Sequence, residues 1–217
     1  MATAERRARE KEQRRQDILR AARKVFFSKG IYNATVDDVA AAAELGKGTI
    51  YLYFSSKEEI LAHLLLEGFD ILINSLRETF SSTESLPSSE RLRRLAATYL
   101  EFSREFSPYF RLMVAFDRGS LREKLPLELR EEIKARNREA LGWVSRVVEE
   151  GVAKGDFVPQ DPWLVAGTLW ASIHGVLILM SIPFRQEIIG FSLDEMMQTV
   201  IETLLRGLEC HNRRVPG

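Results

Sequence analysis

Apolar residues recur at every third or fourth position along most of this chain, the spacing that places them on one face of an α-helix. The segments with this spacing cover about residues 14–29, 35–43, 47–54, 56–80, 90–106, 107–116, 126–152, 162–180 and 192–209. No segment alternates apolar and polar residues between hairpin turns, as a strand would. The pattern therefore predicts an all-α protein of about nine helices.

Capping and turn residues mark where these helices begin and end. Gly30 can end the first helix, and the Ser-rich segment 81–89 is the clearest loop. Ser192 followed three residues later by Glu195 is typical of a helix N-terminus. The helix predicted over residues 56–80 is long enough to connect an N-terminal module with the rest of the chain.

The stretch 35–54 predicts two short helices joined by a tight turn. Thr35 can cap the first helix through its hydroxyl, and Asp38 is placed to bond back to that cap. A turn at Glu44-Leu45-Gly46 separates it from a second helix that begins near Lys47. This arrangement is a helix-turn-helix, in which the second helix can lie in the DNA major groove.

The second short helix, residues 47–53, has one apolar side and one polar side. Ile50 and Phe54, four positions apart, can anchor it to a core. Its other side presents lysine, glycine, threonine and tyrosine, which suit base edges and phosphates, and the major groove admits one helix. The alternative, which periodicity alone leaves open, is an ordinary helical hairpin whose polar side is simply solvated.

A family resemblance supports the DNA-binding alternative. The segment Lys47-Gly-Thr-Ile-Tyr, followed by Phe54-x-x-Lys57-Glu, closely resembles the DNA-binding domain of the tetracycline-repressor (TetR) family. The helix Ile18–Gly30 also resembles the first helix of that family, so the likeness covers about 50 residues. The resemblance implies an all-α homodimer that represses transcription at a palindromic operator and is released by a small ligand in its C-terminal domain.

The resemblance also implies which residues contact DNA. The positions that match are Thr35, Lys47, Gly48, Thr49, Tyr51, Tyr53 and Lys57. Three positions depart from the family pattern. Glu44 replaces a frequent glycine, so we expect no positive φ there; Gly46 replaces a capping hydroxyl; and the apolar Leu52 leaves its contact with DNA open.

Charge is distributed unevenly along the chain. The whole chain has a net charge of zero, yet its first 30 residues contain ten basic and four acidic residues, a net charge of +6. Such a basic end suggests a localised anionic partner. Residues 1–13 are too polar to pack, and we interpret them as a flexible basic arm. The alternatives are a solvated extension of the first helix and an arm that adds phosphate contacts.

Several classes of protein fit the sequence poorly. Cys210 is the one cysteine, and the three histidines lack neighbours at ligand spacing, so no metal site or cofactor is expected. No catalytic set is evident, so we expect no enzyme. The charged N-terminus is unlike a signal peptide, and the apolar segment 163–182 is interrupted by polar residues, which favours a buried helix in a cytoplasmic protein over a membrane span.

Aromatic and soft side chains gather in the C-terminal part of the chain and could line a pocket for a small hydrophobic or aromatic ligand. The candidates are Phe102, Phe106, Tyr109, Phe110, Met113, Phe116, Trp143, Trp170, His174 and Leu177. At helical spacing each could instead fill the core, and His174 alone is more typical of a hydrogen-bonded core histidine.

The last two predicted helices are candidates for a dimer interface. The segment 162–181 is apolar on nearly every side, and such a helix must be covered all round. Pairing with a second copy would form a four-helix bundle. The candidate residues are Val176, Met180, Met197, Val200, Ile201, Leu204, Leu205 and Leu208. We therefore expect a DNA-binding domain over residues 1–55 and a ligand-binding and dimerisation domain over 56–217. The rival interpretation is an all-α small-molecule-binding protein or enzyme without a DNA role.

Overall fold

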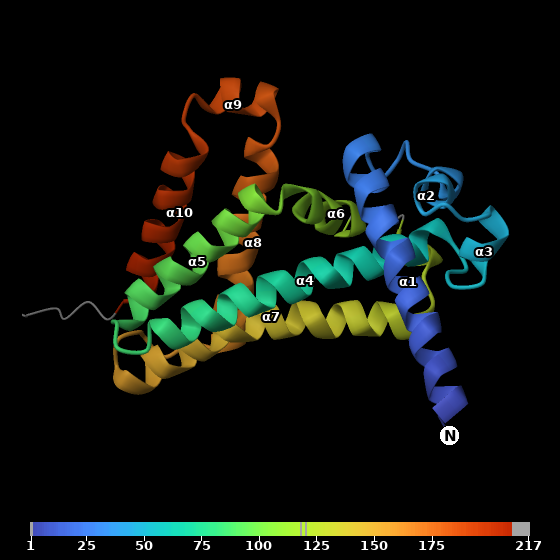
Figure 1. The fold of residues 1–217 in the computed structure, drawn as a ribbon. Coiled ribbons are helices and arrows are strands. Elements are labelled where there is room, and N and C mark those ends of the chain that lie inside the picture. Colours follow the sequence, from blue (N-terminus) through green and yellow to red (C-terminus); the bar gives the residue numbers. More distant parts are fainter. Residues whose placement is uncertain (1, 118, 120, 210–217) are drawn as a thin grey trace, which may run out of the picture. The chain divides into compact units, whose positions relative to one another are not determined.

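A computed structural model describes residues 2–117, 119 and 121–209, and within these residues the fold is all-α (Figure 1). The helices are α1 (Ala2–Lys29), α2 (Val36–Ala42), α3 (Lys47–Tyr51), α4 (Lys57–Ser82), α5 (Ser88–Glu105), α6 (Ser107–Asp117), the 3-10 helix η1 (Arg122–Lys124), α7 (Leu127–Lys154), α8 (Pro162–Met180), α9 (Pro183–Ile189) and α10 (Leu193–Leu208). Across the described residues, extended pairing is limited to an isolated bridge between Phe157 and Glu209. The predicted fold class is confirmed, whereas Cys210 and His211 lie outside the described residues.

Contacts divide the chain into two compact units. The first contains the residues up to Gly68 together with Pro108–Ile133, and the second contains Phe69–Ser107 together with the residues from Lys134 onward. The first unit therefore holds α1 to α3, the first turns of α4, α6, η1 and the start of α7. The boundary predicted after residue 55 stays a prediction about domains; the contacts add later segments to the N-terminal helices.

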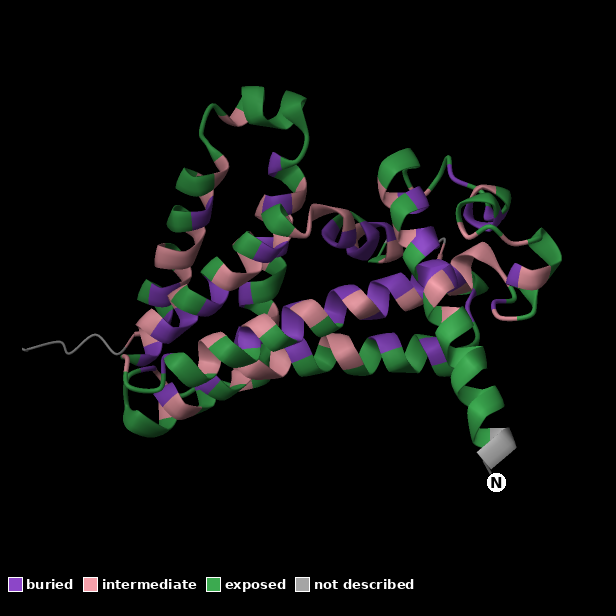
Figure 2. Cartoon of the chain, viewed as in Figure 1, coloured by how far each residue is buried: buried purple, intermediate pink, exposed green. Residues whose placement is uncertain are grey.

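Helix α1 begins well before residue 14, where the apolar pattern starts. From residue 5 to residue 14 every side chain is exposed, and Figure 2 shows this part of α1 in the colour of exposed residues. Ala, Glu, Arg, Lys and Gln favour helix, and an ion pair between Arg6 and Glu10 (3.4 Å) bridges one turn. Residues 5–13 therefore form a solvated part of α1, which agrees with the alternative of a helical extension.

The first unit has a core made by helices α1 to α4. Ile18, Ala22 and Phe26 project from α1 and are at most 1% exposed. Ile50 of α3 and Ile60 near the start of α4 are also fully buried. This core fixes the short helices α2 and α3 on the long α1 and α4.

The second unit combines an apolar pair of helices with one buried charge. Helix α8 packs against α10, and α8 is, among the described helices, the one that is long and apolar enough to cross a membrane by length and composition. Core helices of soluble proteins meet the same criterion, and α8 has seven buried residues. Arg91 is fully buried, forms an ion pair with Glu150, and lies 4.6 Å above the ring of Phe80.

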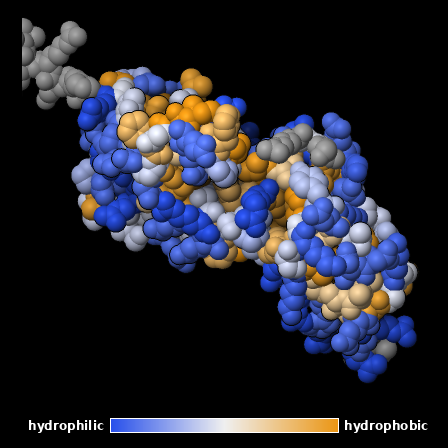
Figure 3. All heavy atoms as spheres, turned by 90° about the horizontal axis from the view of Figure 1, so that it is seen from above, coloured by the Kyte–Doolittle hydropathy of each residue, from blue (hydrophilic) through white to orange (hydrophobic). Residues whose placement is uncertain are grey.

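Apolar side chains also reach the surface of the second unit, and Figure 3 shows apolar patches interrupting a mostly hydrophilic surface. The large exposed ones on or beside α8 and α9 are Trp163, Leu164, Trp170, Leu179, Ile182, Phe184, Ile188 and Phe191. Helix α9 was not predicted from the sequence. Pro183 ends α8 as expected, but it also starts α9, because proline suits the first position of a helix.

Candidate nucleic-acid interface

The N-terminus of α2 is closed by the predicted capping box. The backbone N–H of Asp38 donates to the Thr35 hydroxyl (3.2 Å), and the backbone N–H of Thr35 donates to the Asp38 carboxylate (2.8 Å). Lys29 of α1 also donates to Asp38 (2.6 Å). These bonds lower the pKa of Asp38 to about 2, and the bond from Lys29 contributes most. The cap therefore joins the end of α1 to the start of α2.

The turn between α2 and α3 departs from one expectation. Glu44 has φ = 55°, in the left-handed region, so the expectation that this position needs no positive φ is wrong. The backbone N–H of the following Leu45 bonds to the carbonyl of Ala40, which requires the chain to reverse at Glu44. Non-glycine residues adopt this conformation at a cost. Gly46, with φ = −71° and ψ = 147°, is the N-cap of α3 and forms no side-chain cap bond, as its lack of a hydroxyl predicts.

Helix α3 is anchored on one side, as predicted. Ile50 is fully buried and Phe54 is 1% exposed, so these two residues hold α3 and the turn that follows it against the core. Leu52 lies on the outside and is 77% exposed. Since α3 is only five residues long, its orientation depends on these anchors more than on its own hydrogen bonds.

The other side of α3 carries the residues that the resemblance assigns to DNA. Lys47, Gly48 and Tyr51 are exposed, and Thr49 and Tyr53 are half-buried. Lys47 donates to Asp37 of α2 (2.8 Å), and this bond raises the pKa of Lys47. The lysine is therefore held beside α2 by an ion pair in which both side chains are exposed.

Lys57, the first residue of α4, lies against the loop between α1 and α2. Its ammonium donates to the carbonyl of Tyr32 (3.4 Å) and lies 5.7 Å from the ring centre of Phe26. Burial lowers the pKa of Lys57. Tyr32 itself is 67% exposed, and its contact with Lys57 was not predicted from the sequence.

Helix α6 meets α1 and α4 through Tyr109, one of the predicted pocket residues. The Tyr109 hydroxyl donates to the Glu67 carboxylate (3.0 Å), which also pairs with Arg23 of α1 (3.0 Å). Burial and the neighbouring Glu67 raise the pKa of Tyr109 to about 12. The Tyr109 ring packs edge-on against Phe27, and it lies so close to Gly68 that a Cβ there would be 2.9 Å from the ring. Tyr109 therefore connects α6 to two other helices of the first unit, α1 and α4.

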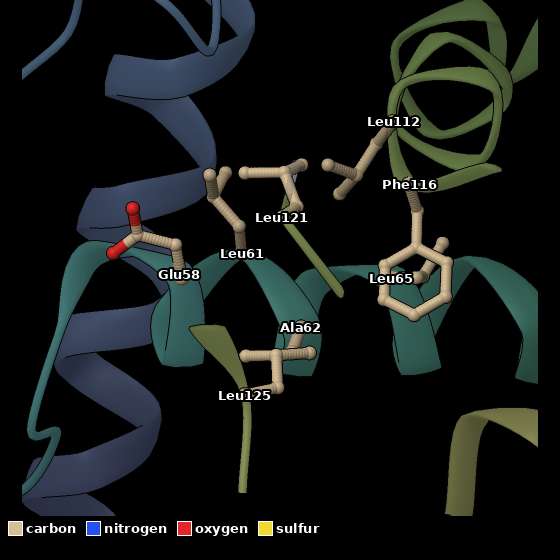
Figure 4. Close-up of a pocket in the computed structure, with 8 residues that line it drawn as sticks. All are labelled: Glu58, Leu61, Ala62, Leu65, Leu112, Phe116, Leu121 and Leu125. Carbon is tan, nitrogen blue, oxygen red and sulfur yellow. The ribbon is translucent and has the colours of Figure 1, made fainter. Parts of the chain in front are cut away.

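The predicted pocket residues do not all belong to one unit. Tyr109, Phe110, Met113 and Phe116 lie in the first unit, and the other six lie in the second. Figure 4 shows side chains of α4, α6 and the following segment pointing toward one another around a small apolar depression. Its lining residues are Glu58, Leu61, Ala62, Leu65, Leu112, Phe116, Leu121 and Leu125. Of the ten predicted residues, Phe116 alone lines this depression, and the ten as one pocket stay a prediction.

In the second unit, the predicted pocket residues form two groups. Phe102 and Phe106 stack with ring centres 5.7 Å apart. His174 stacks on Trp170 (5.3 Å) and shares a hydrogen bond with the hydroxyl of Tyr99 (2.7 Å). Burial lowers the pKa of His174, which favours its neutral form. His174 is thus a hydrogen-bonded buried histidine, and its partner Tyr99 was not among the predicted site residues.

Trp143, Leu177 and the predicted dimer residues also lie in the second unit. Trp143 packs beside Phe80 (5.1 Å), and Leu177 is buried in α8. Four of the predicted dimer residues are already buried within the single chain, namely Met180, Met197, Leu205 and Leu208. The other four are half-buried, namely Val176, Val200, Ile201 and Leu204. Among the described residues there is no cluster of three or more His, Cys, Asp or Glu side chains that could hold a metal ion.

Comparisons with known proteins agree with this geometry. Residues 18–64 match the family described as bacterial regulatory proteins, tetR family, and residues 85–177 match the tetracyclin repressor-like C-terminal domain. The uncharacterized HTH-type transcriptional regulator YhgD of Bacillus subtilis (strain 168) is 30% identical over 155 residues, which cover 70% of this chain and 76% of that protein. The HTH-type transcriptional repressor DhaR of Mycobacterium sp. (strain GP1) is 29% identical, covering 90% and 94%.

A solved structure shares the fold. The transcriptional regulator FadR from Bacillus subtilis, in complex with stearoyl-CoA, superposes with a TM-score of 0.69 at 23% identity, covering 90% of this chain and 99% of that one. An anchored α3 across a tight turn from a capped α2, on an all-α body, defines a helix-turn-helix DNA-binding transcriptional regulator. With both family domains matched, the chain belongs to the TetR family.

Proposed function

We propose that this regulator acts as a homodimeric repressor, which binds a palindromic operator through α3 and leaves it when a hydrophobic ligand binds elsewhere in the chain. The observation that carries the proposal is the exposed side of α3, on a helix whose opposite side is fixed by Ile50 and Phe54. The polar side chains on this side of α3 do not pack into the core of the first unit. They are therefore placed for a partner outside the chain.

Gly48 gives independent support for contact between α3 and DNA. A Cβ at this position would meet no atom within 4 Å, and Gly48 has no positive φ. Neither space nor backbone conformation requires glycine in the free protein, and glycine in a helix costs about 1 kcal/mol relative to alanine. A close approach of the α3 backbone to the groove wall accounts for this choice.

The exposed apolar side chains of α8 and α9 support a homodimer. Phe184 and Ile188 of α9 are 64% and 60% exposed, and Leu164 and Leu179 of α8 are 69% and 46% exposed. A symmetric interface over this surface would cover them. It would also supply the second α3 that a palindromic operator needs, with half-sites about 34–36 Å apart.

The ligand proposal rests on apolar residues and on one relative. The stearoyl-CoA complex of FadR suggests an acyl chain or its CoA thioester as the ligand class. Tyr109 offers a route to α3, because its hydroxyl bonds to Glu67, the partner of Arg23 in α1. A ligand that displaces α6 would break this connection. The chain acts in this account by binding and has no catalytic step.

Lys47→Ala tests the DNA-binding proposal. The purified wild-type protein should bind a fragment covering the region upstream of its own gene, and its affinity should fall steeply with salt. Lys47→Ala should weaken that binding by about 1–3 kcal/mol if the lysine contacts a guanine, or reduce the salt slope by about 1 if it contacts a phosphate. Lys154→Ala, an exposed lysine of the second unit, is the matched control.

Two results would contradict the proposal. One is a wild-type protein that shows no preference for the upstream fragment over random duplex. The other is a Lys47→Ala protein that binds like the Lys154→Ala control. For the ligand, stearoyl-CoA and stearate should each be added to the complex. A ligand that occupies the site at 100 times its Kd should add about 2.7 kcal/mol of stability and release the fragment; stabilisation without release would favour a binding protein whose ligand has no effect on DNA.

A further inference from the structure

The exposed extension of α1 has an ordered distribution of charge. Arg7, Lys11 and Arg14 are spaced four and three residues apart, so they lie on one side of the helix. Ile18, four residues further on, is fully buried. The basic stripe (Arg7, Lys11 and Arg14) therefore continues the side of α1 that packs on the core, beyond the point where the core ends.

The carboxylates of this extension are largely taken by other side chains. Glu10 pairs with Arg6 (3.4 Å), and Glu12 accepts a hydrogen bond from Gln16 (2.8 Å). Asp17 accepts hydrogen bonds from Gln13 (3.0 Å) and from Arg20. By contrast, the structure shows no ion pair within 4 Å for any residue of the basic stripe among the side chains it describes, and all three are exposed.

A helix that is polar all round gains no stability from a core, so its sequence needs another explanation. At 1.5 Å per residue, the seven steps from Arg7 to Arg14 span about 10 Å, about three base-pair steps along one DNA strand. The stripe continues the side of α1 that packs on the core of the first unit, and the same unit contains α2 and α3. Phosphates beside the base pairs that α3 contacts are therefore a fitting anionic partner.

We propose that the basic stripe binds DNA phosphates outside the base pairs contacted by α3, and so increases affinity without reading sequence. This inference rests on the proposed DNA binding and deepens it, because it assigns a second contact surface to the same unit. Phosphate contacts position a protein on the duplex and carry most of the salt dependence of binding.

The test compares two triple variants of the full chain. The stripe variant is Arg7→Gln, Lys11→Gln and Arg14→Gln, and the control is Arg6→Gln, Arg9→Gln and Arg20→Gln, which removes the same charge from the other side of α1. Glutamine keeps a high helix propensity, and all six residues are exposed, so both variants should fold. Their helicity by circular dichroism and their thermal midpoints should match the wild-type protein.

Affinity is measured against salt on two probes, the upstream fragment and a random-sequence duplex of equal length. The stripe variant should lower the slope of log K against log salt by about 2.7, about 0.9 for each of three phosphates, on both probes. The control should keep the wild-type slope. Hydroxyl-radical footprints on the upstream fragment should lose protection in the stripe variant at sugars that Lys47→Ala still protects.

The outcomes separate this inference from the proposed function. If the stripe variant has the same salt slope as the control, the inference is overturned. A loss of affinity for the upstream fragment in Lys47→Ala would in that case still support operator binding. Random-duplex binding that depends on the stripe, without preference for the upstream fragment, supports the stripe and contradicts the operator proposal. Absence of binding to either duplex overturns both. Stripe-dependent binding to phosphatidylglycerol vesicles with unchanged DNA binding also overturns the inference, because the anionic partner would then be a lipid surface.

Discussion

Helices α3 and α8 differ in how much of each is buried within the chain. Of the five residues of α3, the structure buries one, Ile50, whereas α8 buries seven of its nineteen. The seven buried residues of α8 can be explained by what they pack against within the second unit. Most residues of α3 cannot, and under the proposed function they are explained by contact with DNA. Substitutions in the two helices should therefore affect different measurements.

The largest expected contrast is between two leucines. Leu177 of α8 is 4% exposed, and Leu177→Ala should lower the free energy of unfolding by about 2–5 kcal/mol, because it removes buried methyl groups and leaves a cavity. Leu52, directly after α3, is 77% exposed, and Leu52→Ala should change that free energy by less than about 0.5 kcal/mol. Denaturant unfolding of both variants measures the difference.

DNA binding completes this test. If Leu52 touches the groove, Leu52→Ala should change affinity for the upstream fragment while stability stays constant. Equal losses of stability in the two variants would contradict the comparison, because they would mean that the surface beside α3 is held by packing in the same way as α8.

A smaller contrast is expected between two glycines. A methyl group at Gly151 of α7 would overlap the ring of Phe157, so Gly151→Ala should destabilise the protein by about 1–3 kcal/mol. Gly48→Ala meets open space and should stabilise α3 by up to about 1 kcal/mol. It should nevertheless weaken DNA binding, because the added methyl group keeps the helix from the groove.

Thermal unfolding and DNA titration of the two variants together decide this prediction. A Gly48→Ala protein that is more stable and binds DNA as well as the wild-type protein would show that α3 does not approach the groove closely. A Gly151→Ala protein of unchanged stability would show that Phe157 can move aside without cost.

Most of the fold could be predicted from local sequence patterns. The capping boxes at Thr35 and Ser192 were predicted because their partners are three residues away, and both are present. Helix α9 was missed because Pro183 fits both the end of one helix and the start of another. The positive φ of Glu44 was missed because its cost is met by the turn that contains it, where the N–H of Leu45 bonds to Ala40.

The site was predictable only where its residues are close in sequence. The exposed side of α3 and its anchors follow from a spacing of three or four residues. The pairing of Lys47 with Asp37 and the contact of Lys57 with Tyr32 join residues 10 and 25 positions apart. The bond between Tyr109 and Glu67 spans 42 positions. No periodic pattern encodes such pairs, since they depend on how the helices pack.

The smallest expected effect sharpens the comparison through two capping boxes, one in each unit. In the box before α2, hydrogen bonds from Lys29 and Thr35 lower the pKa of Asp38 from 3.8 to about 2. In the box before α10, the bonds from Ser192 lower the pKa of Glu195. A depressed folded pKa means that the charged form stabilises the fold above the unfolded pKa, and that this contribution is lost as pH falls through the folded pKa.

The free energy of unfolding of Asp38→Asn should therefore be lower than that of the wild-type protein by a constant amount above about pH 5. This difference should vanish as the pH falls from about 4 to about 2. Glu195→Gln is the matched control, because it removes the same kind of charge from a cap that lacks a lysine partner in the described structure. The difference in unfolding free energy between Glu195→Gln and the wild-type protein should vanish at a higher pH, since no ammonium group opposes protonation of Glu195. Urea unfolding at a series of pH values, with NMR titration of the two carboxyls, measures both. If the two differences closed over the same pH range, Lys29 would add nothing to the cap, and the link from α1 to the helix-turn-helix would depend on packing alone.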